Sequence, residues 1–119
     1  MEAPQKKTRA VNLFDVPEAV AAVSGVKEVG LVTLTAEEEL TCFKRAKGDN
    51  AKLAMELSKT ALVEADGKPL AQADGTVDTF WKDCEPKLRQ LVLTAYAELH
   101  AAGEEDQQAF LKSRRTRVA

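Results

Sequence analysis

Helix start and stop signals follow one another from Thr35 to Gly103, and they constrain the fold of this 119-residue chain more than any other feature. Thr35 begins a capping box, because its hydroxyl and the carboxylate of Glu38 can each accept a hydrogen bond from the other residue's backbone N–H. Gly48 can take the left-handed conformation that ends this helix, and Asp49 can cap the next one. A helical hairpin is therefore predicted across this short break.

The second half of this region is predicted to be two more helices after a loop. Residues 65–75 contain two Asp-Gly pairs and a proline, which predicts a loop with a small hairpin across the first pair. Thr76 can cap a short helix after the loop. Pro86 suits the first turn of the longest predicted helix, which runs to about Ala102.

The N-terminal part carries the only strand signal that we identify. Residues 26–34 are apolar at both odd and even positions, which indicates a strand that is covered on both sides. A single strand is not stable alone, so residues 10–14, residues 62–64 or another copy of the protein must pair with it. A capping sequence at residues 15–18 predicts a short helix ahead of the strand.

Together these signals predict a mainly α fold, a small single-domain helical bundle with one short strand or β-hairpin near the N-terminus. Residues 1–12 are predicted to be a flexible basic arm, residues 13–103 the helical domain, and residues 104–119 a C-terminal helix or basic tail. The chain has four Phe, one Tyr and one Trp, so its core must depend on Leu, Val and Ala.

The residues that usually carry chemistry are sparse, which predicts a protein that is not an enzyme and that holds no metal or cofactor. His100 is the only histidine, and it is expected to interact with the dipole at a helix end when protonated. Cys42 and Cys84 lie in helical patterns and are expected to be free thiols in a reduced, cytosolic protein. The formal net charge of −2 makes nucleic acid an unlikely partner, and no apolar run is long enough for a membrane span.

The surface is therefore expected to carry the function. The longest predicted helix has a second apolar edge at Leu93 and Tyr96, which either another part of this chain or a partner helix must cover. The aromatic pair Phe80 and Trp81 must likewise be covered either by this chain or by a partner. The tail contains a further apolar pair, Phe110 and Leu111. The predicted partner-contact residues are Phe80, Trp81, Leu93, Tyr96, Phe110 and Leu111.

Three patterns carry a resemblance to a known family. Leu34-Thr35-Ala36-Glu37-Glu38-Glu39 opens a helix, residues 53–63 lead into a turn with the sequence Asp66-Gly67-Lys68-Pro69-Leu70, and residues 88–99 form a leucine-rich helix. Over about two thirds of its length, from about Val29 to Ala102, the chain resembles the small tail assembly chaperones of long-tailed bacteriophages and prophages.

The resemblance implies a helical, non-enzymatic protein in the cytoplasm of the infected host bacterium. Such a protein binds the long helical tape-measure protein and holds it soluble while tail-tube subunits polymerise around it. The resemblance also implies a homo-oligomer or binding in many copies, with the tail-tube protein as a further candidate partner.

Two alternatives belong to other classes. A structural virion component, such as a head-tail connector or tail-completion protein, would form an oligomeric ring and pair the strand at residues 26–34 between subunits. A small helical regulator would bind nucleic acid through the basic residues 112–117, with an affinity that falls steeply as salt is added.

Overall fold

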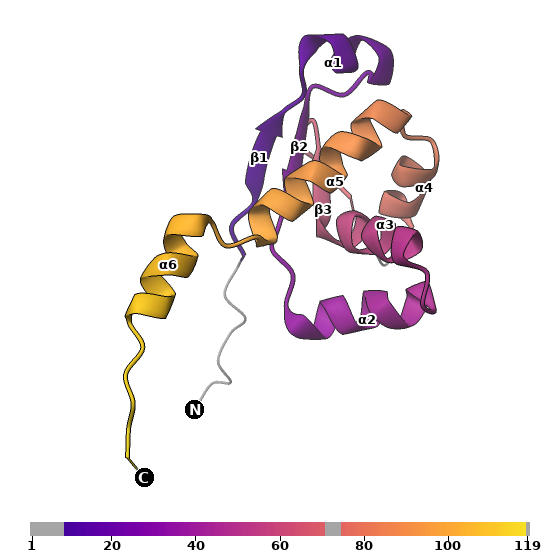
Figure 1. Cartoon of the computed structure of the whole chain (residues 1–119). Coiled ribbons are helices and arrows are strands. Elements are labelled where there is room, and N and C mark those ends of the chain that lie inside the picture. The colour runs from indigo at the N-terminus through magenta and orange to yellow at the C-terminus, as the bar shows by residue number, and fades with distance from the viewer. Residues whose placement is uncertain (1–8, 71–74, 119) are drawn as a thin grey trace, which may run out of the picture.

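The computed structural model describes residues 9–70 and 75–118, which form a small antiparallel sheet with helices packed against it (Figure 1). Helix α5 crosses the sheet, α1 and α2 lie toward opposite ends of it, and α6 stands off the body beyond the end of α5. The elements are β1 (Asn12–Asp15), α1 (Glu18–Ser24), β2 (Glu28–Leu31), α2 (Ala36–Ala46), α3 (Asn50–Ala61), β3 (Leu62–Ala65), β4 (Lys68–Pro69), α4 (Thr76–Lys82), α5 (Pro86–His100) and α6 (Glu104–Lys112).

The sheet has four strands in the order β1-β2-β3-β4, and each neighbouring pair is antiparallel. In β2, Val29 is paired with Phe14 on one side and with Ala65 on the other. A strand within the predicted residues 26–34 is therefore confirmed, although it spans only Glu28–Leu31, and both candidate partners within the chain pair with it. The predicted fold is confirmed in part: helices make up most of the regular structure, but they share one core with a four-stranded sheet, so the fold is not a helical bundle with one strand or hairpin.

A tight turn joins β3 to β4, as the sequence predicts. Asp66 and Gly67 both have positive φ, at 51° and 76°, which is the geometry that an Asp-Gly pair favours in a two-residue hairpin. The Asp66 carboxylate also accepts hydrogen bonds from the backbone N–H groups of Lys27 at 2.8 Å and Glu28 at 3.0 Å. The turn is thus fixed to the start of β2.

The caps of α2 and α3 are confirmed. The Thr35 hydroxyl accepts from the Glu38 backbone N–H at 3.3 Å, and the Glu38 carboxylate accepts from the Thr35 N–H at 2.9 Å. The Asp49 carboxylate accepts from the Lys52 N–H at 3.1 Å. Lys47, one residue before the expected glycine, is the C-cap of α2 in the left-handed conformation.

Two other predicted caps are wrong. Asp15 is paired with Glu28 in the sheet, so α1 begins only at Glu18 and has no side-chain cap. Thr76 is the first residue of α4 rather than its cap, because Gly75 takes the N-cap position with φ of 77°.

The core lies between the sheet and helices α3, α4 and α5. Nine buried side chains form it: Val29, Leu31, Ala61, Leu62, Val77, Trp81, Leu88, Val92 and Ala95. The longest helix, α5, provides three of them at helical spacing, as the apolar pattern predicts. Cys42 and Cys84 are both free thiols, which confirms their expected state.

His100 joins the end of α5 to the segment before α2. Its Nε2 accepts a hydrogen bond from the Leu34 backbone N–H at 2.9 Å, and its Nδ1 lies 2.8 Å from the Tyr96 carbonyl oxygen. The ring thus bridges the end of α5 and the backbone before α2, with Nε2 as the acceptor. His100 lies in the last turn of α5, where the sequence places it.

The structure describes the ends of the chain from Arg9 and up to Val118. Residues 1–8 of the predicted basic arm lie outside the described ranges, and its last residue, Asn12, is already in β1. Arg9 forms an ion pair with Glu38 at 2.7 Å, so this part of the arm contacts the start of α2. In the predicted C-terminal segment, α6 forms, and every residue from 104 to 118 is exposed.

Candidate partner-binding site

An exposed apolar groove runs between α2 and α3, and we call it the hairpin groove. It is a hollow of about 360 Å³ lined by Ala36, Glu39, Leu40, Phe43, Leu53 and Leu57. Leu40 is 52% exposed and Phe43 is 57% exposed, which is unusual for large apolar side chains on adjacent turns of one helix. The groove therefore offers apolar surface that the described parts of this chain leave in contact with solvent.

Small side chains explain why this surface faces outward. Cys42 and Ala46 are the buried residues of α2, and Ser58 and Ala61 are those of α3. The Cys42 Sγ lies 3.3 Å from the Thr60 Oγ1, so the two helices approach closely along these small residues. The larger side chains of α2 remain at the side of this contact and line the groove.

This packing corrects the simplest interpretation of the α2 sequence. Ala36, Leu40 and Phe43 form the apolar stripe of α2, and such a stripe usually faces the core of its own chain. Here none of the three is buried, because Cys42 and Ala46 occupy the inward side. A pair of small residues four positions apart was the sequence signal for the close helix contact, and the exposed groove follows from it.

Charge changes sign along α2, the helix that forms one wall of the groove. Glu37, Glu38 and Glu39 occupy the first turn of α2, and Lys44 and Arg45 occupy its last turn, followed by Lys47. Arg45 is 3.9 Å from the Glu56 carboxylate on α3, and its side chain is 55% exposed. A helix lying in the groove would therefore meet an acidic end and a basic end, which favours one orientation.

Three of the predicted contact residues lie largely within the body. Trp81 is 6% exposed and belongs to the core, and Phe80 is partly buried against it. The Tyr96 ring stacks on His100 with centroids 4.0 Å apart, and its hydroxyl donates a hydrogen bond to Glu39 at 3.3 Å. Burial, together with the nearby Glu39 carboxylate, raises the pKa of Tyr96 to about 12.

The other three predicted contact residues differ in exposure. Leu93 on α5 is partly buried. Phe110 and Leu111 on α6 are 77% and 63% exposed. The six residues thus divide between the body and the projecting α6, and the sequence analysis did not identify Leu40 and Phe43 as contact candidates.

A second apolar hollow, of about 290 Å³, lies between the β1 end of the sheet and α5. Its walls are mainly apolar and carry two carboxylates, and it is lined by Phe14, Asp15, Val16, Pro17, Val29, Leu88, Leu91, Thr94, Ala95 and Glu98. Several of its lining side chains belong to or pack against the core, so this hollow lies at the edge of the core, where the sheet meets α5.

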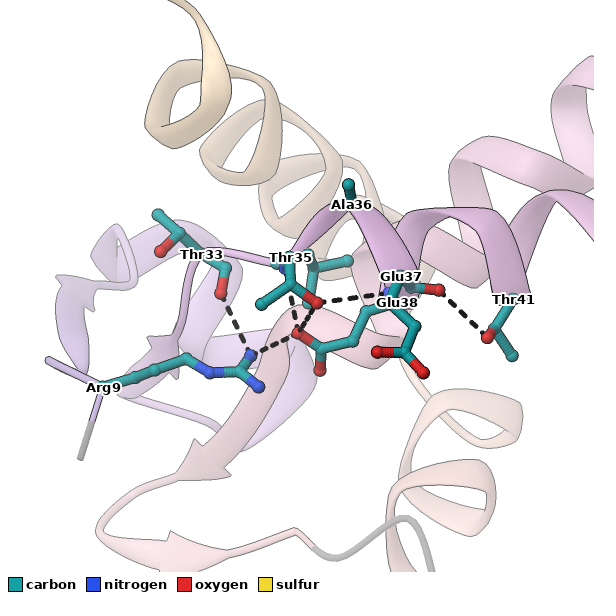
Figure 2. Close-up of a pocket in the computed structure, with 8 residues that line it drawn as sticks. Arg9, Thr33, Thr35, Ala36, Glu37, Glu38 and Thr41 are labelled. Atoms are coloured by element: carbon teal, nitrogen blue, oxygen red, sulfur yellow. Dashed lines mark hydrogen bonds and ion pairs between the residues drawn. The ribbon is translucent and has the colours of Figure 1, made fainter. Parts of the chain in front are cut away.

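A third hollow, of about 840 Å³, has both polar and apolar walls and lies at the start of α2 (Figure 2). The Arg9 guanidinium donates to the Thr33 carbonyl oxygen at 3.1 Å and pairs with Glu38. Burial alone would raise the pKa of Glu38, but the hydrogen bonds from Thr35 and Arg9 lower it below the ordinary value. Thr35 and Glu38 already accept hydrogen bonds from the N–H groups at this helix start. The polar groups of the hollow therefore cap α2 and do not favour the binding of an anion.

The described residues are expected to hold no metal ion, and the titratable side chains bear on this expectation. No group of three His, Cys, Asp or Glu side chains is placed to hold a metal ion in residues 9–70 and 75–118. Burial raises the pKa of the Cys84 thiol, which keeps it in the less reactive protonated form. Among the helices of the same ranges, none has the length and apolar character needed to cross a membrane.

Comparisons with protein-family models, with curated proteins and with solved structures find no match to this chain.

Proposed function

We propose that this protein is a tail assembly chaperone of a long-tailed bacteriophage or prophage, without enzymatic activity, which acts in the cytoplasm of the host bacterium. Its client is the tape-measure protein, and the hairpin groove is the client site. The observation that carries the proposal is the exposed apolar surface of Leu40 and Phe43 in a groove between two helices.

The groove matches the requirements of an amphipathic helix. Such a helix binds by placing apolar side chains at helical spacing into a groove between helices. The hairpin groove supplies apolar walls from both α2 and α3, and its charged ends can fix the direction of the bound helix. A tape-measure protein is a long helix with an apolar stripe, which would aggregate unless the stripe were covered.

The length of the client requires many copies of a protein this small. Each groove can cover only a few helical turns, so copies bound side by side would together cover a long stripe. The tail-tube protein is a further candidate partner, because tube subunits must take over the same stripe as they polymerise. The resemblance in the sequence and the groove in the fold support the same role.

The ring-forming virion component is the weaker candidate. That hypothesis depends on β2 pairing between subunits, but β1 and β3 occupy both edges of β2 within the chain. Among the strands of residues 9–70 and 75–118, β1 and β4 are the outer ones, so an edge for another subunit would have to come from them rather than from β2. The nucleic-acid regulator depends on the exposed basic residues 112–117, and no other described feature favours it.

Co-expression with the tape-measure protein of the same genome tests the proposal. The expected result is a soluble complex with several copies of this protein, captured by a tag on either partner, whereas the tape-measure protein expressed alone is insoluble. Size-exclusion chromatography with light scattering gives the copy number. A stable ring of this protein with no complex would contradict the proposal and favour the virion component.

Point variants locate the client site. Phe43→Glu is expected to abolish capture, because it places a charge in the middle of the apolar groove. Val23→Glu is the matched control, since Val23 is 59% exposed on α1, outside the groove. Leu93→Glu tests the second edge of α5: loss of capture with an unchanged thermal melt would move the client site there, and a collapsed melt would identify Leu93 as a core residue.

A further inference from the structure

The C-terminal helix α6 carries an apolar pair that no described part of the chain covers. Phe110 is 77% exposed and Leu111 is 63% exposed. Residues 101–118 are all exposed, and Figure 1 shows α6 away from the body. Nine residues are too few for a helix to be stable in water without packing against something. To be stable, α6 must therefore pack on a surface other than the described parts of its own chain.

We propose that α6 of one copy docks in the hairpin groove of a second copy, antiparallel to α2, and that two copies exchange these helices reciprocally. The inference concerns the free protein and does not depend on what the client is. Two exposed apolar surfaces of the same chain, Phe110 with Leu111 and Leu40 with Phe43, become buried in one step.

Charge complementarity sets the antiparallel direction. The first turn of α6 is acidic (Glu104, Glu105 and Asp106). The basic residues that end α6 and follow it are Lys112, Arg114, Arg115 and Arg117. In the antiparallel arrangement the acidic turn lies at the basic end of α2, and the basic tail lies at the acidic start of α2.

Other charges near the groove are compatible with this direction. Asp49 lies at the basic end of α2, but its carboxylate is engaged as the cap of α3. At the acidic end, Glu38 is paired with Arg9, while Glu37 is exposed and Glu39 accepts a hydrogen bond from the Tyr96 hydroxyl. A parallel arrangement would instead place acidic turn against acidic turn.

The short link to α5 disfavours this position for α6 on its own chain. His100 contacts Leu34, so α5 ends beside the start of α2. An antiparallel α6 of nine residues is ~14 Å long, so it would have to begin ~14 Å from the start of α2. The link to Glu104 spans at most ~14 Å, so it would have to be fully extended along α2 before the chain reversed direction, whereas docking on another copy needs no such extension.

Reciprocal exchange closes into a dimer with two-fold symmetry. Each α6 starts near the beginning of its own α2 and must start near the end of the partner's α2. Both conditions are met at once when the two α2 helices run antiparallel to each other, which a two-fold axis between them produces. The contact then occurs twice, so the apolar area buried per dimer is doubled.

Sedimentation of the purified full-length protein, without any client, tests the inference. The wild type is expected to sediment as a dimer. Phe43→Glu removes the acceptor groove, and the double variant Phe110→Glu/Leu111→Glu removes the donor helix. Each is expected to weaken dimerisation roughly 100-fold or more, since it removes an aromatic anchor from both copies of the contact. All three positions are more than half exposed, so folding is retained, and Val23→Glu is the matched control.

Mixing the two variants gives the sharpest outcome. The groove-deficient chain still has its α6, and the α6-deficient chain still has its groove, so one intact contact can form between them. The mixture is expected to contain a 1:1 heterodimer, whereas each variant alone is expected to form far less dimer. Charge reversal tests the direction: Lys44→Glu with Lys47→Glu should weaken the dimer about 10-fold, and adding Glu104→Lys with Glu105→Lys should restore it.

Several results would overturn the inference. They are a monomeric wild type at high concentration, a dimer that persists in both variants, or a mixture that remains monomeric. These outcomes are independent of client capture, so failure here and failure of the proposed function can be distinguished.

Discussion

Replacing His100 with alanine should lower the stability of the protein by about 2 kcal/mol. The substitution removes the acceptor of the Leu34 backbone N–H, and leaving a partly buried donor unpaired costs about 1–3 kcal/mol. It also removes the stack on the Tyr96 ring, worth about 0.5–1.5 kcal/mol. Alanine is a better helix former than histidine, which offsets about 0.5 kcal/mol. The melting temperature should fall by about 8 °C.

Urea and thermal unfolding followed by circular dichroism measure this change. Gln90→Ala is the matched control, because Gln90 is an exposed residue of the same helix. His100→Gln is expected to recover part of the loss, since its amide oxygen can accept the Leu34 N–H, although it cannot replace the stacked ring. A loss below 0.5 kcal/mol for His100→Ala would refute the reasoning, because the His100 contacts would then contribute nothing.

Three further substitutions test the fold. Glu38 has a pKa below its ordinary value of 4.5, so its contribution to stability is complete above pH 4.5 and is lost as the pH falls through the lowered pKa. Glu38→Gln should therefore reduce the loss of stability at acid pH in melts recorded from pH 7 to pH 2. Gly30→Ala should destabilise by about 1–3 kcal/mol in urea titrations, because the new Cβ would collide with the Glu64 side chain and lie 2.7 Å from the Val11 Cγ1. Ser58→Ala should be neutral or stabilise by up to about 1 kcal/mol in the same titrations, because the Ser58 hydroxyl is fully buried and has no hydrogen-bond partner among the described residues; a clear loss would reveal a bond to that hydroxyl.

The parts of the fold that depend on neighbouring residues could be predicted from the sequence. Thr35 with Glu38, Asp49, and the Asp66-Gly67 turn all act within a few positions, so their geometry follows from local chemistry. The sheet could not be predicted in full, because β1 and β3 are only four residues long and their partners are distant in sequence. Strand β3 also follows α3 directly at Leu62, without a turn signal between them.

The candidate site could be predicted only in part, for a related reason. The apolar character of Leu40 and Phe43 is plain in the sequence, but whether they face the core depends on how α2 packs on α3. That packing is decided by Cys42 and Ala46, whose small side chains carry a weak hydrophobic signal. Phe110 and Leu111 stay predicted partner contacts, and their exposure on α6 leaves them accessible to a partner.

Reciprocal exchange of α6 would also set the conditions under which a client binds. Once one α6 has docked, the second docks within the same dimer at a raised effective concentration. Both grooves therefore become occupied as a pair. A client that contacts a single groove must compete against this paired contact and would bind weakly. A long helix with a repeated apolar stripe engages many grooves in succession. Each dimer from which it displaces the two α6 helices provides two more grooves for it to bind. The arrangement would therefore favour a long, repetitive partner over a short amphipathic segment, which is the selectivity that the proposed chaperone role requires.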